Sequence, residues 1–173
     1  MTRLLALLLL LLPVFADAGD CGWPAWQQFK QDLVSEDGRV IDYATDSQIT
    51  TSEGQSYAMF FALVADDRQA FARLLRWTQD NLTDGGLQQG LPAWSWGRNG
   101  QGSWEILDRN NASDADLWMA YSLLEAGRLW NRPAYLQLGS EWLWRSTAET
   151  LTLITELGLQ LLPARYGFAQ DGL

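Results

Sequence analysis

Apolar residues recur along this chain with the three- and four-residue spacing of helices. Tyr57, Phe60, Phe61 and Val64 follow one another at i, i+3, i+4 and i+7, which predicts a helix over residues 52–65 with one buried face. Similar spacing predicts helices from Pro24 to the break at Asp37-Gly38, after Asp66-Asp67 to about Asn81, from Ser113, and from Pro133 past Thr150. Because no stretch of any length alternates apolar and polar residues, the predicted fold class is all-α.

The predicted helices come in pairs. Ser52 and Ser113 lie about sixty residues apart, and each opens a strongly apolar helix that is followed by a short break and a partner helix. Such hairpins can form a ring in which inner and outer helices alternate. The starts of successive inner helices then meet at one end, so we expect Glu53, Asp114 and Asp116 to share one face of the molecule.

Glu53 stands in the first turn of the first apolar helix. We expect Ser52 to be the N-cap and Gln55 to complete a capping box. A carboxyl that acts as a general acid must keep its proton near neutral pH, which a partly dry aromatic setting favours and a helix N-terminus opposes. The alternative is that Glu53 is only a first-turn helix acid.

Asp114 and Asp116 form a second acidic site at the next inner helix. Taken alone, they are explained by helix-dipole and capping interactions. Together with Glu53 they suggest hydrolysis of glycosidic bonds, which needs one protonated carboxyl at the leaving oxygen and other carboxylates to hold the sugar or activate water.

Composition narrows the chemistry further. The chain has no histidine and one cysteine, which excludes His-based catalysis, His-ligated metals and an intramolecular disulfide. A net charge of −9 argues against nucleic acid and anionic membranes as partners.

The long segment 83–111 is predicted to be irregular and functional. It carries Trp94, Trp96 and Trp104, which either stack on sugar rings or belong to the core. The other tryptophans assigned to packing are Trp23, Trp77, Trp130, Trp142 and Trp144.

The first residues are predicted to be a secretory signal. Residues 1–18 combine Arg3, the apolar run 4–12 and the small residues of Ala16-Asp17-Ala18, which gives a mature chain of residues 19–173. A lipid anchor at Cys21 is the alternative. No later segment is predicted to span a membrane, so we expect a periplasmic or secreted protein.

The acidic segments resemble those of a known family. The segment Ala112-Ser113-Asp114-Ala115-Asp116-x-x-Met119-Ala120 is similar to the signature of glycoside hydrolase family 8. Thr51-Ser52-Glu53-Gly54-Gln55-Ser56-Tyr57 resembles the other acidic motif of that family. Three further segments resemble the periplasmic endoglucanases that accompany bacterial cellulose synthase: Cys21-Gly22-Trp23-Pro24-Ala25-Trp26, Leu91-Pro92-Ala93-Trp94 with Trp96-Gly97, and residues 123–130.

The resemblance implies an (α/α)6 barrel and endo-hydrolysis of β-1,4-glucan with inversion, without a metal or an organic cofactor. It makes Glu53 the proton donor and Asp114 the second catalytic carboxylate, which we expect to hold and distort the sugar. The candidate glucan contacts are Gln55, Tyr57, Trp94, Trp96, Trp104 and Asp116.

Members of that family are roughly twice as long as this chain. We therefore expect it to form about the N-terminal half of the barrel, with exposed apolar helix flanks and a general base that lies outside these 173 residues. Little activity is expected from such a chain. The alternatives are a catalytically impaired glucan-binding fragment, an enzyme for xylan or chitosan, and a uronate-acting lyase, against which the lack of histidine argues.

Overall fold

The computed structural model describes residues 22–83, 86 and 90–168, so the predicted signal segment and Cys21 lie outside the described residues. The elements in chain order are α1 (Pro24–Leu33), β1 (Thr50–Thr51), α2 (Ser52–Val64), α3 (Arg68–Asn81), β2 (Ser95–Arg98), β3 (Trp104–Asp108), α4 (Ser113–Leu129), α5 (Pro133–Thr150), β4 (Leu151–Ile154) and β5 (Gly158–Leu161). All five predicted helices are present, although α1 and α5 end earlier than predicted. Pro24 occupies the first turn of α1, as expected.

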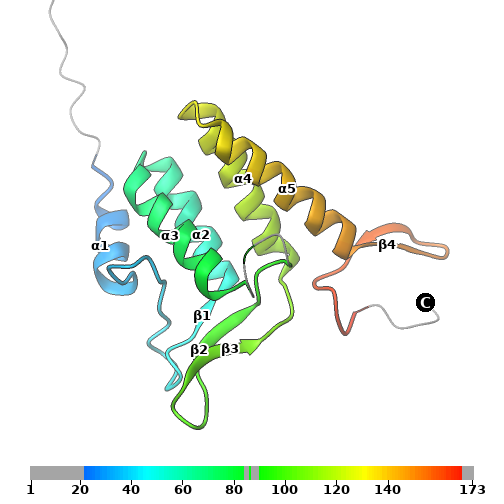
Figure 1. Cartoon of the computed structure of the whole chain (residues 1–173), viewed down its shortest axis with the longest axis horizontal. Coiled ribbons are helices and arrows are strands. Elements are labelled where there is room, and N and C mark those ends of the chain that lie inside the picture. Colours follow the sequence, from blue (N-terminus) through cyan, green and yellow to red (C-terminus); the bar gives the residue numbers. More distant parts are fainter. Residues whose placement is uncertain (1–21, 84–85, 87–89, 169–173) are drawn as a thin grey trace, which may run out of the picture.

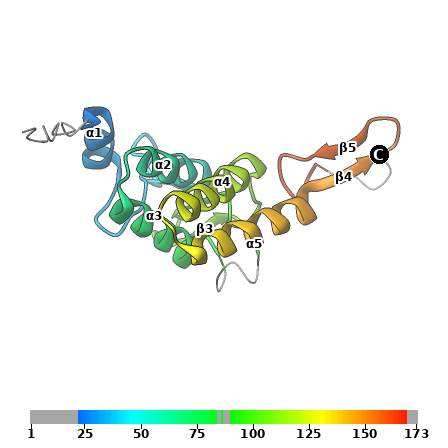
Figure 2. The same ribbon diagram turned by 90° about the horizontal axis from the view of Figure 1, so that it is seen from above.

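Two helix hairpins form the body of the molecule (Figure 1). α2 packs against α3, α4 packs against α5, and the contact between α2 and α4 joins the two hairpins. Figure 2 shows the helices side by side along the long axis, with α1 at one end and the β4–β5 hairpin at the other. The core between them is built from side chains of all five helices, including Trp26, Met59, Phe71, Leu123 and Trp142. The predicted pairing of helices is therefore confirmed.

The close approach of α4 and α5 depends on two glycines. A Cβ on Gly127 would lie 2.7 Å from the backbone nitrogen of Leu136, and a Cβ on Gly139 would lie 3.0 Å from that of Leu124. Any larger side chain at Gly127 would push the helices apart. This packing fixes α5 behind α4 and so fixes the elements that follow α5.

The predicted N-cap of α2 was wrong by one residue. Thr51 is the N-cap of α2, and its hydroxyl accepts the Gly54 amide over 3.1 Å. Ala112 is the N-cap of α4, and the Ser113 hydroxyl instead donates to the carbonyl of Leu162. The hydroxyl of Ser113 thus ties α4 to a segment far along the chain.

The predicted fold class is confirmed, although short strands that the sequence did not predict accompany the helices. Segment 83–111, predicted to be irregular, contains β2 and β3, which form an antiparallel sheet in the order β1-β2-β3. The strands are short and the register shifts between Ser95 and Trp96, so no long alternation is visible in the sequence. The sheet places Trp94 directly beside the start of α2, since the Ser52 amide donates to the Trp94 carbonyl.

α5 ends at Thr150 rather than running past it, and the chain continues into the β4–β5 hairpin. Leu151 pairs with Leu161 and Leu153 with Leu159, so four leucines share one face. That face is exposed, with Leu153 at 74% and Leu159 at 64%. Trp144 on α5, which the sequence analysis assigned to packing, is 76% exposed. The expected uncovered apolar surface is therefore present. In the described part of the chain, no helix is long and apolar enough to cross a membrane.

Candidate active site

Glu53 lies in the first turn of α2, where two neighbours hold its carboxylate. The Trp94 indole nitrogen donates to Glu53 Oε1 over 2.9 Å, and the Ser52 hydroxyl donates to Oε2 over 3.3 Å. Trp94 itself remains 39% exposed. The sheet turns the chain back toward α2 and thereby delivers the indole, so an exposed aromatic face borders a carboxylate in a fixed position.

Tyr57 lies between the two predicted catalytic carboxylates. It stands one helical turn after Glu53 on α2, and its hydroxyl is 3.5 Å from Asp114 Oδ2 at the start of α4. The pKa of Tyr57 is raised, first by partial burial and then by the negative charges of Asp114 and Glu53. The structure therefore brings Glu53, Tyr57 and Asp114 together, as expected from the meeting of inner helix starts.

A groove of about 350 Å³ opens beside these side chains. Its lining residues are Glu53, Trp94, Asp108, Asn110, Asn111, Ala112, Asp114, Pro163, Ala164 and Phe168. Neither Asp108 nor Asn110 was predicted from the sequence to be a site residue. Both stand just before the acidic motif, where the end of β3 leads into α4. This position in the sequence is the signal that could have identified them as site residues.

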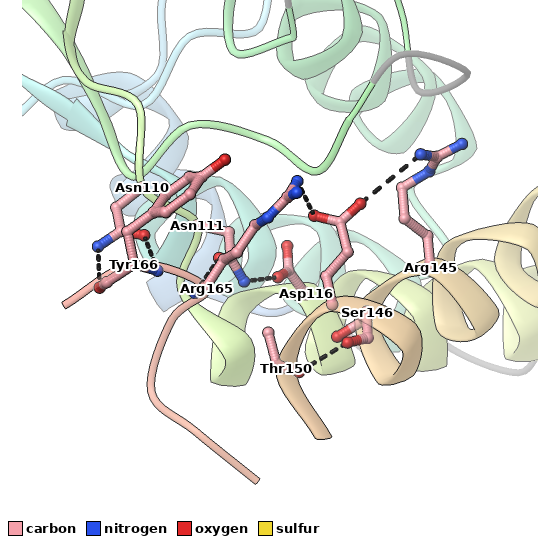
Figure 3. Close-up of polar contacts among 9 residues, drawn as sticks. Asn110, Asn111, Asp116, Arg145, Ser146, Thr150, Arg165 and Tyr166 are labelled. Carbon is pink, nitrogen blue, oxygen red and sulfur yellow. Dashed lines mark hydrogen bonds and ion pairs between the residues drawn. The ribbon is translucent and has the colours of Figure 1, made fainter. Parts of the chain in front are cut away.

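Asp116 is fully buried behind this groove and does not line it. Its Oδ2 accepts the Asn111 side-chain amide over 2.8 Å (Figure 3). Burial raises the pKa of Asp116 to about 7; the Asn111 amide and the Trp142 indole oppose this, and the charges of Glu149 and Asp114 add to it. Within the described residues, neither Asp116 Oδ1 nor Trp142 Nε1 has a hydrogen bond of normal geometry. The structure therefore does not place Asp116 among the groove residues.

Gln55 is likewise buried, and its side chain acts within the fold. Its oxygen accepts the Val40 amide over 2.7 Å, and its NH₂ group donates to Gly38, Leu74 and Thr78. Gln55 therefore joins α2, α3 and the segment before β1. The expected capping box does not form, because the amide points inward.

Trp96 and Trp104 stack on each other, with ring centroids 5.0 Å apart and planes 12° apart. The Arg39 guanidinium lies 4.6 Å from each ring centroid, and Arg98 lies 4.8 Å from that of Trp104. Trp77 meets the edge of Trp96. These contacts occupy ring faces that a sugar would need, and neither ring lines the groove beside Glu53. Trp94 is the tryptophan that the structure brings to the carboxylates.

The arrangement suits acid-assisted cleavage of a polar polymer. It provides a carboxyl on a rigid helix end, a second carboxylate, a phenol between them and an exposed indole. In the described part of the chain, no group of three or more Asp, Glu or Cys side chains is placed to hold a metal ion.

Comparison with known proteins agrees with this geometry. The profile of the family described as glycosyl hydrolases family 8 matches residues 1–173. A protein named endoglucanase from Escherichia coli O157:H7 is 54% identical over 163 residues, which cover 94% of this chain and 44% of that protein. An endoglucanase from Salmonella typhi is 52% identical and is covered to 45%.

Solved structures show the same similarity. The endo-1,4-D-glucanase from Vibrio fischeri ES114 is 49% identical and superposes with a TM-score of 0.83, over 86% of this chain and 43% of that one. The family 8 endoglucanase Cel10 from Klebsiella pneumoniae gives a TM-score of 0.76 at 31% identity. These structures are (α/α)6 barrels, of which the helices described above form the N-terminal part. The chain spans less than half the length of the curated relatives it matches. On the match along its whole length, the chain belongs to glycosyl hydrolases family 8.

Proposed function

We propose that this chain provides the acid-bearing side of the active site of an inverting endo-β-1,4-glucanase. The observation that carries the proposal is the meeting of Glu53, Trp94, Tyr57 and Asp114 at the starts of the two inner helices. The family membership and the endoglucanase names of the relatives support the reaction class.

In the proposed reaction, Glu53 transfers its proton to the glycosidic oxygen as the bond from C1 to that oxygen breaks. The Asp114 carboxylate accepts hydrogen bonds from hydroxyls of the sugar at the cleavage point, and the Tyr57 hydroxyl donates a hydrogen bond to a sugar hydroxyl. A water molecule adds to the opposite face of C1 and gives its proton to a general base. That base is proposed to lie outside these 173 residues.

Trp94 supports a sugar polymer as the substrate. Its exposed indole borders Glu53, and an aromatic face is a flat apolar surface onto which a pyranose ring can pack. We propose cellulose as the polymer and export to the periplasm after removal of residues 1–18. The proposed biological role is support of a cellulose synthase complex, while xylan and chitosan are the competing substrates.

The proposal is tested with the purified chain, soluble cellulose derivatives and cello-oligosaccharides. We expect binding, together with hydrolysis that is roughly 10²- to 10⁴-fold slower than that of a longer family member, because general-base assistance contributes about that factor. Glu53→Gln should abolish the residual hydrolysis and leave binding intact. The matched control is Glu36→Gln, an exposed carboxylate remote from the groove.

The outcomes separate the two candidate functions. Residual hydrolysis that is lost in Glu53→Gln, with release of the α-anomer detected by NMR, supports the inverting enzyme. If both the wild-type chain and Glu53→Gln bind glucan and neither hydrolyses it, the result supports the glucan-binding fragment. Neither binding nor hydrolysis of glucan, together with binding of xylan or chitosan oligomers, would overturn the choice of substrate.

A further inference from the structure

A chain of hydrogen bonds starts at the buried Asp116 carboxyl and leads toward the groove. Asp116 Oδ2 accepts the Asn111 side-chain amide over 2.8 Å, and Asn111 Oδ1 in turn accepts the backbone amide of Arg165 over 2.8 Å (Figure 3). Both polar ends of the Asn111 side chain are therefore engaged. Its rotamer is set by a partner on α4 and a partner on the segment after β5.

The neighbouring Asn110 extends this connection through its side chain and through its backbone carbonyl. Its side chain pairs with the Tyr166 backbone, donating to the carbonyl over 3.0 Å and accepting the amide over 3.1 Å. Its own carbonyl accepts the Trp94 backbone amide over 2.5 Å. Trp94 then donates its indole N–H to Glu53. The connection from Asp116 to Glu53 thus passes through Asn111, Asn110 and Trp94.

The geometry points to Asp116 as a positioning residue, which holds Asn111 and thereby sets the backbone that places the Trp94 indole on Glu53. This inference rests on the role of Glu53 under the proposed function. Asp116 cannot contact a substrate in the groove directly, because its side chain is fully buried and does not line the groove. It stands two residues after Asp114 on α4, so one helix turn carries both a groove carboxylate and the residue that holds Asn111.

The charged groups near Asp116 interact with partners other than Asp116. Glu149 on α5 forms ion pairs with Arg145, at 3.7 Å, and with Arg165, at 3.3 Å. Asp114 faces the hydroxyl of Tyr57. Of the described side chains, only Asn111 is joined to Asp116 by a hydrogen bond of normal geometry. Any effect of Asp116 on the groove is therefore expected to pass through Asn111.

The test follows the Trp94 indole directly, so it does not depend on catalysis. In the ¹⁵N-labelled chain, the Trp94 indole resonance is identified by its absence from Trp94→Phe, and the exchange rate of the Arg165 amide is measured in parallel. Asp116→Leu removes the acceptor and keeps the number and branching of the side-chain heavy atoms, and Asn111→Ala removes its donor. Both should shift the Trp94 indole resonance and speed Arg165 amide exchange roughly 5- to 10-fold, as expected for the loss of one hydrogen bond.

The conservative variant and a control distinguish positioning from general packing. Asp116→Asn keeps an oxygen that accepts the Asn111 amide, so both readouts should stay at the wild-type values. Asp32→Asn, an exposed carboxylate on α1, should also change neither. If Asp116→Leu does not fold, Asn111→Ala gives the same test from outside the helix.

An unchanged Trp94 resonance in Asn111→Ala overturns the inference, as does an equal shift in Asp116→Leu and Asp116→Asn. Failure of the proposed function gives a different result. The chain would then neither bind nor cleave glucan, while the Trp94 and Arg165 readouts would still respond to Asn111→Ala.

Discussion

Trp94 and Glu53 are separated by 41 residues and meet through one hydrogen bond of 2.9 Å. Trp94 precedes β2, and Glu53 stands just after β1, so the pairing of β1 with β2 brings them together. The small sheet, which is peripheral to the helical body, thus determines where the candidate acid and its aromatic neighbour lie.

Trp94→Ala should reduce affinity for cello-oligosaccharides about tenfold, because it removes the exposed ring face beside Glu53. Trp94→Phe keeps a ring and should bind within about threefold of wild type. Calorimetric titration with cellohexaose measures both. Trp144→Ala is the matched control, since Trp144 is more exposed but lies on α5. Equal loss of affinity in Trp94→Ala and Trp144→Ala would contradict the assignment.

Asp116 should make the fold less stable as the pH rises toward neutrality. Its pKa is raised from 3.8 to about 7 in the folded chain, so the unfolded chain releases this proton at lower pH. Between these values the free energy of unfolding should fall by about 1.4 kcal/mol per pH unit, about 4 kcal/mol in total. The loss is complete above the folded pKa.

Asp116→Asn should remove that dependence, because an amide does not titrate. Relative to wild type it should gain stability steadily from pH 4 to pH 7 and keep a constant difference above pH 7. Urea unfolding at pH 4, 6 and 8 measures the difference. A constant difference between Asp116→Asn and wild type at all three pH values would show that the carboxyl titrates normally.

Gly127→Ala should destabilise the chain by about 1–3 kcal/mol, because the new Cβ meets the backbone of Leu136 at 2.7 Å. Alanine favours a helix by only about 1 kcal/mol over glycine, which is too little to compensate. Gly100→Ala, with nothing within 4 Å of the new Cβ, is the control and should be nearly neutral. Thermal unfolding of both variants shows whether Gly127→Ala lowers or raises the stability of the chain. A stabilised Gly127→Ala would show that α5 moves away from α4 at little cost.

The exposed leucine face of the β4–β5 hairpin should make the chain self-associate. Leu153→Lys combined with Leu159→Lys should shift sedimentation velocity profiles toward the monomer. Thr152→Lys with Gln160→Lys adds the same charge to the opposite face of the same pair of strands, and should leave association unchanged. A monomeric wild-type chain at micromolar concentration would refute this prediction.

Asp67→Ala should destabilise the chain by about 1–2 kcal/mol at pH 7, because Asp67 is the N-cap of α3. Although burial raises its pKa, bonds from Lys30, the Ala70 amide and Trp26 outweigh burial and lower it below 3.8. This stabilisation is therefore present above pH 3.8 and is lost as the pH falls through the folded value. Urea unfolding at pH 7 and pH 2.5 should show a larger difference between variant and wild type at the higher pH.

The helices were predictable because burial of one face leaves a periodic pattern, as at Tyr57, Phe60 and Phe61. The meeting of Glu53 with Asp114 followed from the pairing of hairpins. The strands were not predictable, since β2 and β4 have four residues each. Four positions are too few for an alternation of apolar and polar residues to be recognised. Leu151 and Ile154 at a spacing of three instead read as a continuation of α5.

Polar residues were harder to assign than apolar ones. Gln55 and Asp116 were predicted to contact glucan because they belong to the two acidic motifs that resemble those of the family. In a helix, however, neighbouring positions point about 100° apart, so Gln55 faces the core. The identity of a polar residue does not reveal whether its partners are solvent, substrate or buried backbone groups.

The pairing of sequence neighbours into helix hairpins also has a consequence for synthesis. α2 meets α3 across the short turn at Asp66 and Asp67, and α4 meets α5 across Asn131 and Arg132. Contacts between neighbours form quickly, so each hairpin is expected to fold soon after its second helix leaves the ribosome. Glu53 is on the first hairpin and Asp114 on the second, so nascent chains in which α5 has left the ribosome should already hold both carboxylates at one groove.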